Sequence, residues 1–203
     1  MTGVVGSPDA GAAVTLAGIS TVAAGIALLV SGVCLVVFFT TEIEEWGRAN
    51  DATIALFAAL MIPAAFEIYD RYAVGSRWAV GMPTLIGIAG MLVIMVTSGL
   101  TALAKLDWLL SAKIGAVGFG GFLTWMATAC VLILRRGGLP DSLAWFGLIT
   151  VGIMGVTVAL SIRFIRLHGS LSGEVQPPVG MWVVLAIAFL CLPAWTMWLG
   201  VSL

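Results

Sequence analysis

The ionisable side chains beside apolar stretches are the residues best suited to bind a ligand in this chain. Glu67, Asp70 and Arg71 follow an uncharged stretch that runs from Ala52 to Phe66. Residues three and four apart lie on one helix face, so Glu67 can pair with Arg71 and has Asp70 beside it. A carboxylate at membrane depth suits proton or cation binding, or recognition of a polar head group. The spacing favours the structural alternative, in which an ion pair with Arg71 anchors the end of a short span.

A second charged group follows the fifth apolar stretch, where Arg163 and Arg166 precede His168. Guanidinium groups match phosphate geometry and would suit a phosphate or a lipid head group. The alternative that we favour is simple anchoring of a helix end at the membrane interface. The ligand-binding hypothesis therefore covers Glu67, Asp70, Arg71, Arg163 and Arg166.

The sequence contains no motif for a nucleophile, a catalytic zinc, a P-loop or a dinucleotide. There is one histidine, and the three cysteines stand inside apolar runs without a CxxC spacing. The acidic cluster Glu42, Glu44, Glu45 and Asp51 does not follow the calcium-loop spacing and predicts a solvated loop. We therefore expect no catalytic residue, no metal and no cofactor. We lean against an enzyme, although a carboxylate-dependent membrane enzyme stays a third hypothesis.

Composition predicts a membrane protein. Hydrophobic residues make up 61% of the 203 residues, and charged residues make up 9%, against about 25% charged in soluble domains. The net charge of −1 leaves no basic surface for nucleic acid. The lipid bilayer is therefore the expected surrounding, and nucleic acid is not an expected partner.

The apolar runs predict an all-α polytopic membrane bundle of six transmembrane helices in a single domain, 1–203. A span needs about 20 apolar residues in helical form. The predicted helices lie near 13–38, 52–72, 79–103, 114–134, 142–165 and 179–202. Five tryptophans near the predicted span ends indicate an aromatic belt, namely Trp46, Trp78, Trp108, Trp145 and Trp182.

Local signals place the second helix and suggest how the third and fourth helices pack. Asn50, Asp51 and Thr53 are suitable N-caps, so the second helix is expected to begin there. Pro63 lies one turn before Glu67 and removes a backbone donor from that helix. Glycines recur in the third and fourth helices at Gly81, Gly87, Gly90, Gly99, Gly115, Gly118, Gly120 and Gly121. They predict close helix packing, or a groove that faces a ligand.

A resemblance adds a location but no activity. It rests on Trp46-Gly47 with Asn50-Asp51, on Arg135-Arg136 with Leu139-Pro140 and Leu143-Ala144-Trp145-Phe146-Gly147, and on Pro193-Ala194-Trp195. On these residues the chain resembles a broad set of uncharacterised bacterial polytopic integral membrane proteins, grouped under domains of unknown function. The resemblance implies a multi-pass protein of the bacterial inner membrane, for which we prefer an orientation with both termini inside. It implies no functional residue.

Two classes of function follow from these observations. The first is a non-enzymatic membrane protein that binds a small or lipidic ligand, or that serves as an accessory subunit beside a membrane protein partner or a second copy. The alternative is a small transporter, with a site near Glu67 and the proline-containing second and sixth helices. The short connections between the predicted helices favour the first class, because they leave little room for a catalytic domain.

Overall fold

The computed structural model describes the backbone of residues 8–74, 77–168 and 179–203, and the side chains of 16–74, 77–160, 163, 180 and 183–203. Six helices make up the described part of the chain: α1 (Pro8–Thr41), α2 (Glu44–Tyr72), α3 (Arg77–Ala102), α4 (Trp108–Arg136), α5 (Asp141–His168) and α6 (Val179–Ser202). Each is long and apolar enough to cross a membrane. The prediction of an all-α bundle with six spans is confirmed, and the described residues contain no strand.

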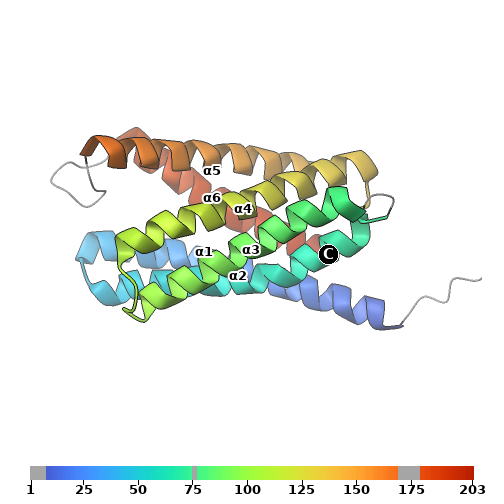
Figure 1. Ribbon diagram of the computed structural model, residues 1–203, viewed down its shortest axis with the longest axis horizontal. Helices are drawn as coiled ribbons and strands as arrows, with labels where there is room; N and C mark the ends of the chain where they lie inside the picture. Colours follow the sequence, from blue (N-terminus) through green and yellow to red (C-terminus); the bar gives the residue numbers. More distant parts are fainter. Residues whose placement is uncertain (1–7, 75–76, 169–178) are drawn as a thin grey trace, which may run out of the picture.

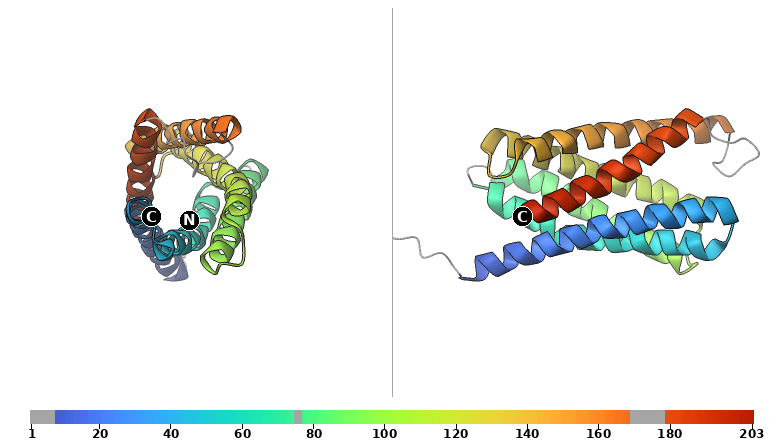
Figure 2. Two further views of the ribbon diagram at one scale, coloured as in Figure 1. Left: turned by 90° about the vertical axis from the view of Figure 1, so that its left-hand side faces the viewer. Right: turned by 180° about the vertical axis from the view of Figure 1, so that it is seen from behind.

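The helices follow one another around a ring, and α6 closes the ring against α1 (Figures 1 and 2). Neighbouring helices run in opposite directions, so α1 begins and α6 ends at the same end of the bundle (Figure 2). The contact between α1 and α6 joins the first and last elements of the chain. Because these two helices are far apart along the chain, local sequence patterns do not predict this contact.

Three helices begin well before their predicted starts: α1 begins at Pro8 rather than near 13, and α2 and α4 also begin early. Helix α2 begins at Glu44, and its N-cap Ile43 makes no side-chain capping bond. Glu44 and Glu45 lie in its first turn, where carboxylates interact favourably with the helix dipole. The predicted acidic loop is therefore wrong, because only residues 42 and 43 separate α1 from α2. The predicted exposure is confirmed for Glu42, Glu44 and Glu45.

Helix α4 begins at Trp108, six residues before its predicted start near 114. Asp107 caps it, since its carboxylate accepts from the backbone N–H groups of Leu109 at 2.9 Å and Leu110 at 3.1 Å. Hydropathy alone missed this turn because the charges of Asp107 and Lys113 flank it. The capping residue, rather than the apolar run, fixes the start of the helix.

An aromatic cluster joins α2, α4 and α6 inside the ring. Phe57 of α2 meets Phe122 of α4 edge to face at 5.5 Å between ring centroids. Trp125 meets Trp195 in the same geometry at 6.5 Å, and the indole N–H of Trp195 donates to the Leu143 carbonyl of α5 at 3.2 Å. The core therefore holds α4, α5 and α6 together by aromatic packing and one buried hydrogen bond.

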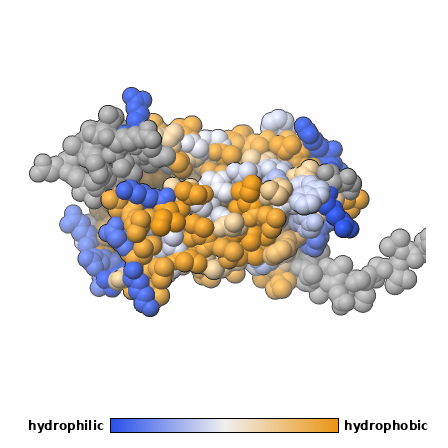
Figure 3. Space-filling view, viewed as in Figure 1, coloured by the Kyte–Doolittle hydropathy of each residue, from blue (hydrophilic) through white to orange (hydrophobic). Residues whose placement is uncertain are grey.

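The outer surface carries a broad apolar belt with charged residues towards the two ends (Figure 3). Trp46, Trp78, Trp108 and Trp145 are exposed, as the predicted aromatic belt requires. The side chain of Trp182 lies outside the described residues. This surface is that of a multi-pass membrane protein, with its side chains turned towards lipid.

Candidate functional site

The predicted ion pair is present. Arg71 donates from Nη2 to Oε1 of Glu67 at 3.2 Å, and the Arg71 and Glu67 side chains are 27% and 15% exposed. Asp70 lies next to them on the exposed surface. Both partners belong to one helix, so this pair needs no neighbouring element to position it.

The two predicted charged groups do not meet. Arg163 is exposed near the end of α5, at the opposite end of the bundle from Glu67. The side chains of Arg166 and His168 lie outside the described residues. Arg163 therefore does not share a site with Glu67, Asp70 and Arg71, and the ligand-binding hypothesis for these residues and for Arg166 stays a prediction. Among the described side chains, no group of three or more His, Cys, Asp or Glu is arranged to hold a metal ion.

A different site lies where α1 meets α6. Three glycines, Gly18, Gly25 and Gly32, recur every seven residues on α1, a spacing that keeps them on one stripe of the helix. A Cβ at Gly18 would lie 2.7 Å from the carbonyl oxygen of Gly200. A Cβ at Gly25 would lie 3.0 Å from the carbonyl oxygen of Pro193. At Gly18 only α6 backbone lies this close, whereas at Gly25 the Met197 side chain also packs against the glycine. At both positions the absence of a side chain on α1 lets the two helices approach closely.

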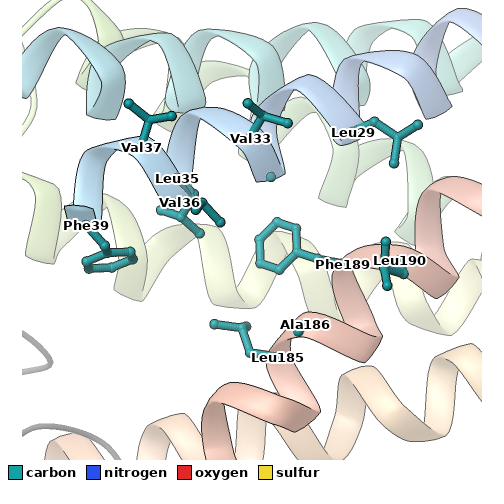
Figure 4. Close-up of a pocket in the computed structure, with 11 residues that line it drawn as sticks. Leu29, Val33, Leu35, Val36, Val37, Phe39, Leu185, Ala186, Phe189 and Leu190 are labelled. Carbon is teal, nitrogen blue, oxygen red and sulfur yellow. The ribbon is translucent and has the colours of Figure 1, made fainter. Parts of the chain in front are cut away.

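The two helices separate at the third glycine. A Cβ at Gly32 would meet only the Phe189 ring, at 3.5 Å, which is an ordinary van der Waals contact. Phe189 extends from α6 towards α1 and holds the two helices apart (Figure 4). From Gly32 towards the end of α1, the α1–α6 contact opens into a groove.

We call this opening the α1–α6 groove. It has a cavity volume of about 490 Å³ and is lined by Leu29, Gly32, Val33, Leu35, Val36, Val37, Phe39, Leu185, Ala186, Phe189 and Leu190 (Figure 4). Every one of these residues is apolar. The volume falls within the range of about 300–1,000 Å³ that is usual for small-molecule sites.

A buried hydrogen bond holds α1 in place beside the groove. The Ser31 hydroxyl donates to Oδ1 of Asn50 on α2 at 2.7 Å, and both residues are buried. Asn50 was predicted to cap α2, and that prediction is wrong. Its side chain instead bonds to the turn of α1 next to Gly32. Helix α1 is therefore attached to α2 at this level, while the face of α1 that is turned towards α6 borders the groove.

Sequence reasoning missed this groove because it looked for glycines only in the third and fourth helices. The seven-residue spacing on α1 was a detectable signal for a helix-packing stripe. Which of the three glycines would face backbone, and which would face an aromatic ring, could not be detected from α1 alone. That depends on Gly200, Pro193 and Phe189 of α6.

The chain was compared with protein-family models, with curated proteins and with solved structures, and none of them matches. The resemblance to bacterial membrane proteins and the inner-membrane location therefore stay predictions. The site must be interpreted from its own chemistry.

Proposed function

We propose that this is a non-enzymatic membrane protein that binds the hydrocarbon chain of a lipidic ligand in the α1–α6 groove. One observation carries the proposal: an apolar groove of about 490 Å³ lies between two helices that are both long enough to cross a membrane. Its rim residues Leu29, Val33 and Leu190 are exposed and belong to the lipid-facing belt. A hydrocarbon chain can therefore enter sideways from the bilayer.

The lining selects against polar ligands. No side chain in the groove can donate or accept a hydrogen bond, and burying an unpartnered polar group costs roughly 2–7 kcal/mol. Lipid tails are as apolar as leucine, so the hydrophobic effect does not drive a chain from the bilayer into the groove. Binding rests instead on the shape of the groove and on the many small dispersion contacts of a chain that fills it.

The accessory-subunit and transporter hypotheses stay predictions. Glu67 does not line the α1–α6 groove and is already paired with Arg71. The transporter hypothesis therefore gains no support from this groove. A partner subunit is compatible with lipid binding and would be detected in the same experiment.

Native mass spectrometry of the gently purified protein tests the proposal with two leucine substitutions. Gly32→Leu places a side chain in the groove without meeting backbone, because the nearest atom belongs to the Phe189 ring. We expect its lipid occupancy to fall about tenfold, which corresponds to about 1.4 kcal/mol. Gly152→Leu is the control, since Gly152 is exposed on α5 with nothing within 4 Å of an added Cβ.

The wild type and Gly152→Leu should both retain a lipidic mass that Gly32→Leu loses. Equal retention by all three proteins would exclude the groove as the binding site. A partner protein that stays bound to the wild type and to Gly32→Leu alike would instead favour the accessory-subunit hypothesis.

A further inference from the structure

A smaller cavity lies inside the ring, directly behind the groove. Its volume is about 70 Å³, and its lining comes from five of the six helices: Leu28, Ile54, Phe119, Met154, Thr157, Leu185, Ala188, Phe189, Leu192 and Pro193. Two of these residues, Leu185 and Phe189, also line the α1–α6 groove. These two side chains therefore form the wall between the groove and the interior.

The interior cavity suits hydrocarbon rather than water. Thr157 is the only residue of its lining with a polar side chain, and the Thr157 hydroxyl already donates to the Ile153 carbonyl at 2.9 Å. Cavities lined only by apolar or satisfied groups stay dry and accept apolar ligands. The end of an alkyl chain fits these conditions, and a polar head group does not.

The wall between the two spaces consists of side chains rather than backbone. Phe189 and Leu185 are both only half-buried. Opposite Phe189, α1 presents Gly32, which has no side chain to hold the ring in place. Side-chain rotation needs no movement of the helices, so the ring can turn while the tight contact at Gly18 and Gly200 stays closed.

We propose that Phe189 is a gate, and that the groove and the interior cavity form one site for a single long acyl chain. The acyl chain lies in the groove, and its terminal carbons pass Phe189 into the interior cavity, beside Met154 and Thr157. The occupant is a membrane lipid rather than a second protein, because the groove is continuous with the lipid-facing belt through Leu29 and Leu190. This inference rests on the proposed function and adds the place where the end of the bound acyl chain lies.

Photo-crosslinking in vesicles tests the gate. The full-length protein is reconstituted in phosphatidylcholine that contains a small fraction of one of two photoreactive phosphatidylcholines. One carries a diazirine on the terminal carbon of an acyl chain, and the other carries it in mid-chain. We expect the mid-chain probe to label groove residues such as Val33 and Val36, and the terminal probe to label interior residues such as Met154 and Phe119.

Substitutions of Phe189 then test its role. Phe189→Trp places a bulkier side chain between the groove and the interior cavity. It should reduce interior labelling severalfold while the groove stays labelled. Phe189→Ala should increase interior labelling. Ile149→Ala on α5 is the matched control, since Ile149 is exposed and lines neither the groove nor the interior cavity, and it should leave interior labelling unchanged.

The outcomes separate the two proposals. If both probes label only the groove, the gate is overturned and lipid binding in the groove stands. Labelling of the exposed α5 segment around Gly152 gives the background. If neither probe labels the groove more strongly than this segment, both proposals fail. Interior labelling that persists in Phe189→Trp would overturn the role of Phe189, and the two probes on the wild type decide the question even if a variant does not fold.

Discussion

Two glycine-containing helix contacts in this ring, α3–α4 and α1–α6, differ in how far they stay closed. Between α3 and α4, a Cβ at Gly118 would lie 2.8 Å from the Gly90 carbonyl oxygen, and a Cβ at Gly121 would lie 2.8 Å from the Ile86 carbonyl oxygen. Between α1 and α6, only the half with Gly18 and Gly25 is this close. The other half opens at Gly32 into the groove.

The difference shows that a glycine stripe on one helix does not by itself close a contact. Gly90 faces glycines of α4, and Gly18 faces Gly200, so in both places backbone meets backbone. Gly32 meets only the ring of Phe189, at an ordinary van der Waals distance, and both residues line the groove. The residue on the opposite helix decides whether a glycine brings two backbones together or leaves a ligand site.

The largest effect is expected at the closed α3–α4 contact. A methyl group at Gly90 would overlap the Gly118 carbonyl oxygen and lie 2.9 Å from the Phe122 backbone nitrogen. We expect Gly90→Ala to lower the free energy of unfolding by about 1–3 kcal/mol, the usual cost of overpacking. Thermal unfolding in detergent would measure it. Gly120→Ala on α4 is the control and should not destabilise, because nothing lies within 4 Å of its added Cβ and alanine is the better helix former.

A smaller effect is expected at the closed end of the α1–α6 contact. A Cβ at Gly200 would lie 2.7 Å from both the Gly18 carbonyl oxygen and the Val22 backbone nitrogen. Gly200→Ala should lower the free energy of unfolding by about 1 kcal/mol, the low end of the overpacking range, since α6 already diverges from α1 at its other end. The same unfolding assay applies. A loss as large as that of Gly90→Ala would mean that the two contacts are equally rigid.

The smallest effect is expected at the hydrogen bond that holds α1 beside the groove. Ser31→Ala removes the bond to Asn50 and should cost about 0.6 kcal/mol, the average for such bonds in membrane proteins. It should also speed lipid exchange from the groove, because α1 loses its attachment to α2 there. Thr124→Ala is a suitable control, since its exposed hydroxyl bonds only within α4. Unchanged exchange would show that Ser31 does not position the groove.

The fold class was predictable because membrane spans are a local property of the chain. Each of the six helices carries an apolar stretch long enough to cross a membrane, and the pair of Glu67 and Arg71 follows from spacing within one helix. The starts of α2 and α4 were not predicted correctly. Both helices begin with a turn that contains or follows charged residues, so apolar runs place their starts too late.

The function-related features were less predictable. Close packing was expected from glycines of the third and fourth helices and is confirmed at Gly87, Gly90, Gly118 and Gly121, where an added Cβ would approach the opposite helix more closely than van der Waals contact allows. At Gly120 an added Cβ would meet nothing within 4 Å. The same residue type on the same helix therefore has two different surroundings, and only the position of α3 distinguishes them.

The sequence by itself determined that the chain forms six membrane-length helices and that Glu67 can pair with Arg71, because both depend on residues close together along the chain. The tertiary structure alone decided that Gly18 meets backbone while Gly32 meets Phe189. It also decided that Asn50 bonds to α1 rather than capping α2. Packing in a membrane depends on which side chain stands opposite on another helix, and for the α1–α6 groove that helix lies at the far end of the chain.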